Sequence, residues 1–90
     1  QNSIGSNVET LYHILDNKAE ALEFIVKENS SIAGIALKDL KLKSNLLIGC
    51  IHRKGKVIIP RGNDCMQAGD TVIVVTTQRG LDDLQDILVR

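Results

Sequence analysis

The sequence has few aromatic residues and no excess of charge of either sign. Among 90 residues only Tyr12 and Phe24 are aromatic, and 11 basic residues are balanced by 11 acidic ones. Proteins that bind single-stranded nucleic acid need aromatic platforms on which bases stack. A basic surface is the usual footprint of duplex binding. The two absences together argue against nucleic acid as a partner.

Long apolar runs are also missing. No stretch approaches the roughly 20 apolar residues that a membrane-spanning helix requires. The opening residues, QNSIGSN, hold neither the basic nor the apolar region of a signal peptide. We therefore expect no direct membrane insertion, and the lack of an initial Met indicates a fragment or a processed product.

Cysteine is scarce, and its spacing excludes the usual cysteine-based sites. Two residues, Cys50 in an apolar run and Cys65 in a loop, do not make a disulfide framework. We expect Cys50 to be a small buried hydrophobe and both thiols to be reduced, as in a cytosolic protein. Together with His13 and His52 they form no CxxC or HxxxH pair, so no metal site is predicted.

Catalytic and nucleotide-binding motifs are absent as well. Nothing matches a nucleophile elbow or a cysteine-protease signature, and there is neither a P-loop nor a GxGxxG. Asp82, Asp83 and Asp86 fit a solvated face at the start of a helix, where the helix dipole favours carboxylates. The sequence therefore predicts a binding or interaction domain and not an enzyme.

The apolar residues that are present, 43% of the chain, suffice for one small domain. Ser6 and Glu9 fit a capping box at the start of a helix. An apolar stripe at helical spacing follows, made of Val8, Leu11, Tyr12 and Leu15. Such a stripe must cover a surface, which in a fragment can belong to a neighbouring subunit or domain.

Strand patterns dominate the rest of the chain. Alternating or continuous apolar runs bounded by turn residues predict strands, at residues 19–26, 46–53, 57–59 and 71–77. Weaker helical spacing predicts a short helix or helical turn at 35–42 and a final helix at 81–88. The expected fold class is α+β, with a small, mainly antiparallel sheet and flanking helices.

A basic cluster lies at the turn between the second and third strands. Lys54 and Gly55 form a two-residue connection, and Pro60 ends the third strand because it cannot donate to a sheet ladder. Arg53, just before the turn, can pair bidentately with a carboxylate or a phosphate. Alternatively, it is a side chain whose head extends into solvent from the strand end. The residues alone leave both interpretations open.

Several motifs in the same order resemble a known family. They are Asn7–Tyr12 (NVETLY), Ala19–Phe24 (AEALEF), Gly34–Leu42 (GIALKDLKL), Ile51–Gly55 (IHRKG), Ile58–Gly62 (IIPRG) and Gly69–Val74 (GDTVIV). Together they resemble the C-terminal regulatory domain, RCK_C or TrkA-C, of TrkA-type potassium-uptake regulatory subunits. Met66 is a mild departure, since the family usually has Leu or Ile there.

The resemblance implies an architecture and a set of partners. Residues 1–18 would be a helical linker from a preceding domain, and residues 19–90 the TrkA-C domain. In the family a Rossmann domain binds NAD or ATP; because that domain is absent here, no cofactor is expected in this chain. The implied partners are a second copy of the chain and a membrane potassium channel or transporter subunit. The implied location is the cytoplasm, at the inner face of the membrane.

The resemblance also implies a ligand. Related domains dimerise, and some bind cyclic di-AMP in a cleft at the dimer interface. Carried over by position, the ligand-binding residues would be Ile48, Arg53, Ile58, Ile59 and Pro60. The predicted dimer interface includes Val8, Leu11, Tyr12 and Leu15. The alternative is a purely structural dimerisation module of the regulatory ring that has no ligand of its own.

Overall fold

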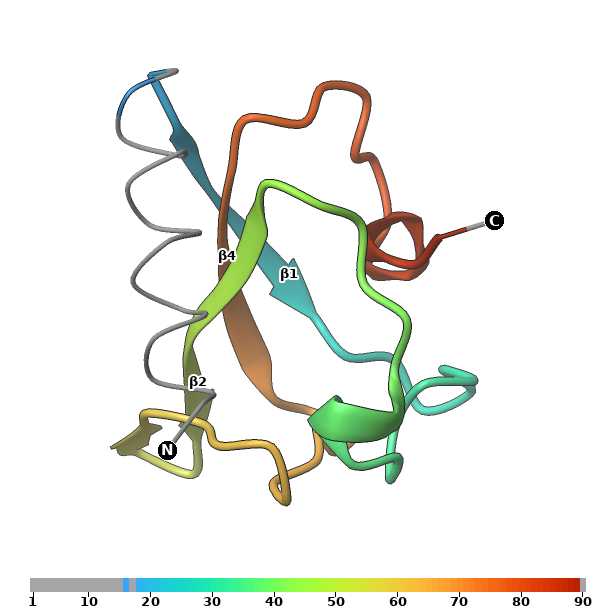
Figure 1. The fold of residues 1–90 in the computed structure, drawn as a ribbon. Coiled ribbons are helices and arrows are strands. Elements are labelled where there is room, and N and C mark those ends of the chain that lie inside the picture. Colours follow the sequence, from blue (N-terminus) through green and yellow to red (C-terminus); the bar gives the residue numbers. More distant parts are fainter. Residues whose placement is uncertain (1–15, 17, 90) are drawn as a thin grey trace.

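Four antiparallel strands form one sheet in the computed structural model, which describes residues 16 and 18–89 (Figure 1). The strands are β1 (Glu20–Ile25), β2 (Leu46–Arg53), β3 (Lys56–Ile58) and β4 (Thr71–Thr76), in the spatial order β1-β4-β2-β3. Two single-turn 3₁₀ helices, η1 (Leu37–Asp39) and η2 (Leu84–Ile87), complete the elements. The predicted strands are thus confirmed: β2 has the predicted bounds, β1 and β4 are slightly shorter, and β3 begins and ends one residue earlier than predicted.

The strand β4 is central, and its register fixes which side chains share a face. Val74 lies opposite Leu22 of β1 and Ile48 of β2. Along β4 the buried side chains alternate with half-buried ones, as period-two geometry requires. One face of the sheet therefore collects the core, and the opposite face, here called the second face, collects the remaining side chains.

The β2–β3 hairpin closes with the tight turn that its sequence predicts. Both turn residues have positive φ, 51° for Lys54 and 78° for Gly55. This is the type I′ pattern whose twist matches that of the flanking strands. Further back on β2, the register with β4 shifts between Ile48 and Cys50. A regular strand would place every second residue on the core face. Because of the shift, Ile48 on the core face of β2 is followed by Ile51, three residues later.

The core lies between one face of the sheet and two irregular segments, residues 26–45 and 77–89, which run along the same side of it (Figure 1). Its buried apolar side chains come from the sheet, from both segments and, for Met66, from the loop between β3 and β4. They are Val26, Ile32, Leu46, Ile48, Ile51, Met66, Val72, Val74, Leu81, Leu84 and Ile87. At about 25 cal/mol per Å² of apolar surface removed from water, this cluster is the main stabilising contribution.

The final helix is much shorter than predicted, and the segment at 35–42 contains a helical turn, the shorter of its two predicted forms. Of the segments predicted at 35–42 and 81–88, only the turns η1 and η2 are helical. Long-range pairing explains the difference, because Leu42 forms a β-bridge with Leu88 and Ala36 with Cys65. Backbone groups committed to such bridges, for example Val89 N–H donating to Lys41 O at 2.7 Å, cannot join a helix.

Of three other predictions, one falls on residues that the structure does not describe, and two can be compared with it. The stripe Val8, Leu11, Tyr12 and Leu15 and its helix lie outside the described residues. Both cysteines are free thiols, and Cys50 is half-buried, so it is less buried than the small buried hydrophobe that the sequence predicts. Within residues 16 and 18–89, no helix has the length and apolar character needed to cross a bilayer.

Candidate functional site

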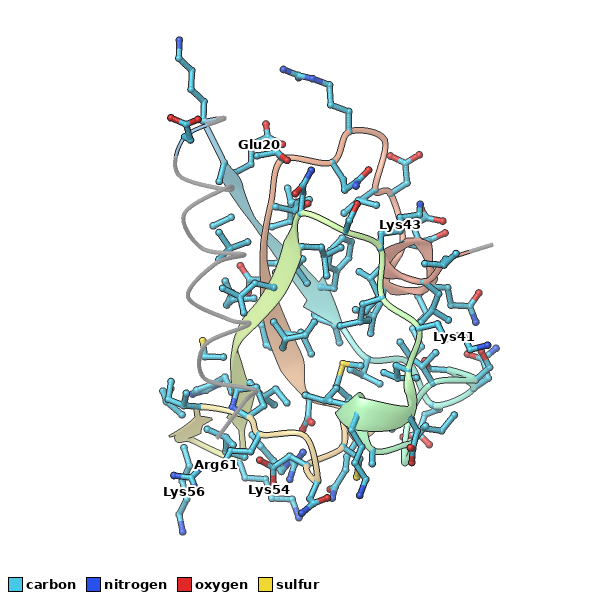
Figure 2. The ribbon with its side chains drawn as sticks, viewed as in Figure 1. Glu20, Lys41, Lys43, Lys54, Lys56 and Arg61 are labelled. Atoms are coloured by element: carbon cyan, nitrogen blue, oxygen red, sulfur yellow. The ribbon has the colours of Figure 1, made fainter. Side chains whose placement is uncertain are left out.

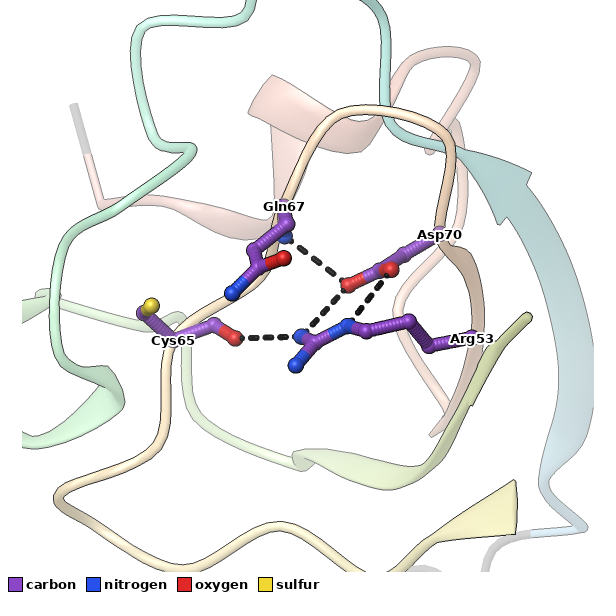
Figure 3. Close-up of polar contacts among 4 residues, drawn as sticks. All are labelled: Arg53, Cys65, Gln67 and Asp70. Carbon is purple, nitrogen blue, oxygen red and sulfur yellow. Dashed lines mark hydrogen bonds and ion pairs between the residues drawn. The ribbon is translucent and has the colours of Figure 1, made fainter. Parts of the chain in front are cut away.

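Arg53, the last residue of β2, forms an ion pair with Asp70 just before β4 (Figure 3). Its Nε donates to Asp70 Oδ1 at 2.9 Å, and its Nη2 donates to Asp70 Oδ2 at 2.8 Å. The same Nη2 also donates to the carbonyl oxygen of Cys65 at 2.9 Å. This is the bidentate fork that guanidinium and carboxylate geometry favours. The strand end is thereby tied to two points of the loop between β3 and β4.

Asp70 is almost fully buried, with 1% of its surface exposed. Its Oδ2 accepts a further hydrogen bond from the backbone N–H of Gln67 at 2.8 Å, across a turn in which Gly69 has φ 92°. The hydrogen bond from Arg53 lowers the pKa of Asp70 below its usual value; burial opposes this shift, and the Gln67 N–H adds to it. The carboxylate is therefore charged at neutral pH and is stabilised within the fold.

The pKa of Arg53 is raised above its usual value, first by the hydrogen bond to Asp70. About a quarter of the side chain, 25%, is still exposed. Its Nη1 makes no hydrogen bond within the described part of the chain. Arg53 thus has a structural partner that sequence reasoning missed, and it retains one donor that can reach another molecule. Its role in ligand binding stays a prediction.

The other predicted ligand residues differ in accessibility. Ile48 belongs to the core, with 8% exposed, and it faces the buried side of the sheet. Ile58 is half-buried opposite Ile51, whereas Ile59 is 71% exposed and Pro60 is partly exposed beside it. The hairpin therefore brings four of the five residues to one end of the molecule. Ile48 lies earlier on β2, away from the hairpin, and its side chain is in the core.

Three exposed cations surround this end of the sheet, where Figure 2 labels them: Lys54, Lys56 and Arg61. Two exposed apolar side chains lie among them, Val57 (66%) and Ile59 (71%). We call this group the hairpin surface. Such a surface can bind an anion that also carries flat apolar groups. The cations attract its negative charges, and the exposed apolar side chains pack against its flat groups.

The second face of the sheet is also apolar. It carries Ala21 and Ile25 from β1, Leu47 and Cys50 from β2, and Ile73 and Val75 from β4. Ile25 is 65% exposed. A sheet face of this composition is stabilised by burial against another element.

Metal chemistry finds no support in the described residues. Nowhere in residues 16 and 18–89 do three or more His, Cys, Asp or Glu side chains gather in a group that could hold an ion.

Comparison with known proteins places this geometry in a family. The family model for the TrkA-C domain matches residues 21–89. The Trk system potassium uptake protein TrkA homolog of Archaeoglobus fulgidus is 39% identical over 70 residues, which is 78% of this chain and 16% of that protein. The corresponding homolog of Pyrococcus abyssi is 32% identical over 71 residues, covering 78% of this chain and 31% of that protein. The chain thus spans less than a third of the length of these relatives.

A solved structure shares the fold. It is described as "Structure of RCK domain with cda" and has a TM-score of 0.63 at 22% identity, covering 77% of this chain and 97% of that one. The family match extends over both the hairpin and the loop that holds Asp70, so the ion pair and the hairpin surface lie inside the matched region. The chain belongs to the TrkA-C domain family.

Proposed function

We propose that this chain is a cytosolic regulatory domain of a potassium-uptake system, which dimerises and binds a small anionic effector such as a cyclic dinucleotide. The observation that carries the proposal is the hairpin surface, where exposed cations lie beside exposed apolar side chains. The names of the TrkA relatives support the potassium-uptake role. The fold neighbour described as an RCK domain with cda supports an effector-binding role.

In this proposal the phosphates of the effector pair with Lys56, Arg61 and the remaining donor of Arg53. Its base-like faces pack on Ile59 and Pro60. An effector alters gating only if it binds one conformation better than another. Arg53 already joins β2 to the loop before β4 through Asp70. An effector that forms a hydrogen bond with Arg53 can therefore shift these two segments relative to each other.

The remaining parts of the proposal concern the whole protein. A membrane potassium channel or transporter subunit would be the partner, and the domain would act in the cytoplasm at the inner face of the membrane. We assign no NAD or ATP to these residues, because the sequence has no GxGxxG to cradle a dinucleotide. We also assign no catalytic role.

A second candidate is an assembly module without a ligand. The second face favours it, because Leu47, Ile73 and Val75 lie on it together with the exposed Ile25, beside Glu23 and Thr71, and subunits bury apolar side chains of this kind. Such a module would hold a regulatory ring together through this face and through the predicted interface at Val8, Leu11, Tyr12 and Leu15. Sedimentation at micromolar concentration distinguishes this candidate, since a monomeric chain would count against it.

Calorimetric titration with cyclic di-AMP tests the effector role. We expect saturable heat that is lost with Ile59→Ser and weakened with Arg53→Lys, which keeps the charge but cannot form the two-donor fork. Lys41→Gln, at a distant exposed lysine (Figure 2), is the matched control and should bind normally. No heat with the folded wild-type chain, for this or other nucleotides, would leave the assembly module as the better explanation.

A further inference from the structure

The backbone groups on the outer edge of β1 have no hydrogen-bond partner among residues 16 and 18–89. Val26 N–H donates to Asp70 O at 2.9 Å, and Val26 O accepts from Gly69 N–H at 2.8 Å, so the polar groups of Val26 point toward β4. Because alternate residues of an antiparallel strand point to opposite sides, those of Ala21, Glu23 and Ile25 point away from it. Within the described residues, β1 pairs only with β4, and these outward groups bond to none of them.

A groove runs beside this edge. It has a volume of about 510 Å³, with Glu23, Phe24 and Ile25 on one wall and Asp82, Asp83 and Gln85 on the other. The buried side chain of Leu84 lies between the walls. The groove thus lies alongside the row of outward backbone groups and provides a partly apolar surface next to it.

Soluble proteins usually protect such an edge with charged side chains, above all lysine, with a proline or with a bulge. The strand β1 has no lysine, proline or bulge over Glu20–Ile25, and its register with β4 is unbroken. Its charged side chains, Glu20 and Glu23, repel an acidic strand but attract a basic one, and Ile25 on the second face is 65% exposed. An edge of six regular residues with an exposed apolar side chain is able to accept another strand.

The charge of the groove indicates what that strand carries. Three carboxylates line it, those of Glu23, Asp82 and Asp83, against the single ammonium of Lys27. Asp83 accepts a backbone hydrogen bond that caps η2, while Asp82 is fully on the surface. Antiparallel pairing with β1 of a second copy, centred on the outward groups, would place Glu23 of one copy opposite Glu23 of the other, and like charges opposite each other are destabilising. A basic segment has the complementary charge.

We propose that the β1 edge is a docking site for an extended, basic segment of a partner protein, which adds to the sheet as a fifth strand. Its backbone bonds to the outward groups of Ala21, Glu23 and Ile25. Apolar side chains on one face of the added strand cover Ile25, and Lys or Arg side chains on its other face reach Asp82 and Asp83. The site lies at the opposite edge of the sheet from β3 and the hairpin surface, so it is independent of the proposed effector.

The test uses the full chain and a fluorescent peptide of about nine residues, long enough to span the strand, in which lysine alternates with valine or threonine. Fluorescence anisotropy should show saturable binding that weakens with salt, and a matched peptide with glutamate in place of lysine should not bind. Backbone amide resonances of Ala21, Glu23 and Ile25 should shift in two-dimensional NMR spectra, while those of the hairpin should not.

Two variants make the test specific. Glu23→Pro removes one outward N–H and leaves the groups facing β4 in place, so it should abolish binding in a chain that still folds. Asp82→Lys, at an exposed position, should weaken binding by about tenfold, the equivalent of 1.4 kcal/mol. Lys38→Gln, at an exposed lysine of η1 that lines neither the groove nor the hairpin surface, is the control and should bind normally.

Three results would overturn the proposal. They are equal binding of the lysine and glutamate peptides, undiminished binding by Glu23→Pro, and a wild-type chain whose β1 amides are protected by self-association that Glu23→Pro abolishes. The last result would assign the edge to a second copy of the chain.

Discussion

Asp70 and Asp82 are both aspartates beside ends of the same sheet, yet the fold uses them in opposite ways. Asp70 is 1% exposed and accepts hydrogen bonds from Nε and Nη2 of Arg53 and from the Gln67 N–H. Asp82 is exposed in a groove whose other charged side chains are Glu23, Asp83 and Lys27. A carboxylate removed from water needs a partner inside the fold, whereas an exposed one remains available to other molecules.

The cations at the hairpin divide in the same way. Arg53 is joined to Asp70, while Lys54, Lys56 and Arg61 extend into solvent a few residues away. Proximity in the chain therefore says little about which charge is structural. A cation is structural when the carboxylate that it pairs with is buried, as Asp70 is. Substitution of such a cation should therefore change stability more than substitution of an exposed one.

The largest effect is expected for Arg53→Ala. This change leaves the Asp70 carboxylate buried with only the Gln67 N–H as a partner, and breaking a buried pair from one side costs about 3 kcal/mol. Arg61→Ala is the matched control, because its side chain is exposed, and its effect should stay within about 0.5 kcal/mol. Urea unfolding at neutral pH measures both. Equal losses in the two variants would contradict the distinction between structural and free cations.

Acid should weaken the same pair in a predictable direction. Because the pKa of Asp70 is lower in the folded chain than in the unfolded one, its contribution is complete above the unfolded value of about 4 and is lost as pH falls through the folded value. Between pH 7 and pH 3, wild type should therefore lose more unfolding free energy than Asp70→Asn. Asp82→Asn should keep the wild-type loss. If Asp70→Asn lost as much as wild type, the pair would not be the source of the acid sensitivity.

The strands and the hairpin could be predicted because their signals are local. Alternation in residues 19–26 and the Lys54-Gly55 turn fix strand boundaries within a few residues. The segment at 35–42 contains only the shorter of its two predicted forms, a helical turn, and most of the helix predicted at 81–88 is missing. Their helical spacing is also local, but the bridge between Leu42 and Leu88 joins residues far apart in the chain and replaces most of each helix.

The site shows the same limit. The basic cluster and the bidentate capacity of Arg53 are visible in the sequence, whereas the exposure of Ile59 is known only from the structure. The actual partner of Arg53 is not, because Asp70 lies 17 residues further on and Gly69-Asp70 is most simply a turn before a strand. The register of β2 with β4, including its shift after Ile48, brings the two side chains together.

A smaller effect is expected for Gly69→Ala. The backbone of Gly69 has φ 92°, a conformation that residues with a Cβ rarely adopt, although open space surrounds the position. The strain should cost about 1 kcal/mol and loosen the turn that presents the Gln67 N–H to Asp70. Ala68→Ser, at the neighbouring exposed position, is the control and should change the urea midpoint little. A Gly69→Ala variant as stable as wild type would show that the turn tolerates rearrangement.

The smallest effect on stability is expected for Lys56→Gln. Lys56 is exposed on the short edge strand β3, and no ion pair involving it exists among the described residues. Removing its charge should therefore change the unfolding free energy by less than about 0.5 kcal/mol. If the hairpin surface binds an anionic effector, the same change should still weaken calorimetric binding of a cyclic dinucleotide, and added salt should reduce the difference between the variant and wild type. A stability loss as large as that of Arg53→Ala would mean that Lys56 is also a structural charge, and the division between the two kinds of cation at the hairpin would fail.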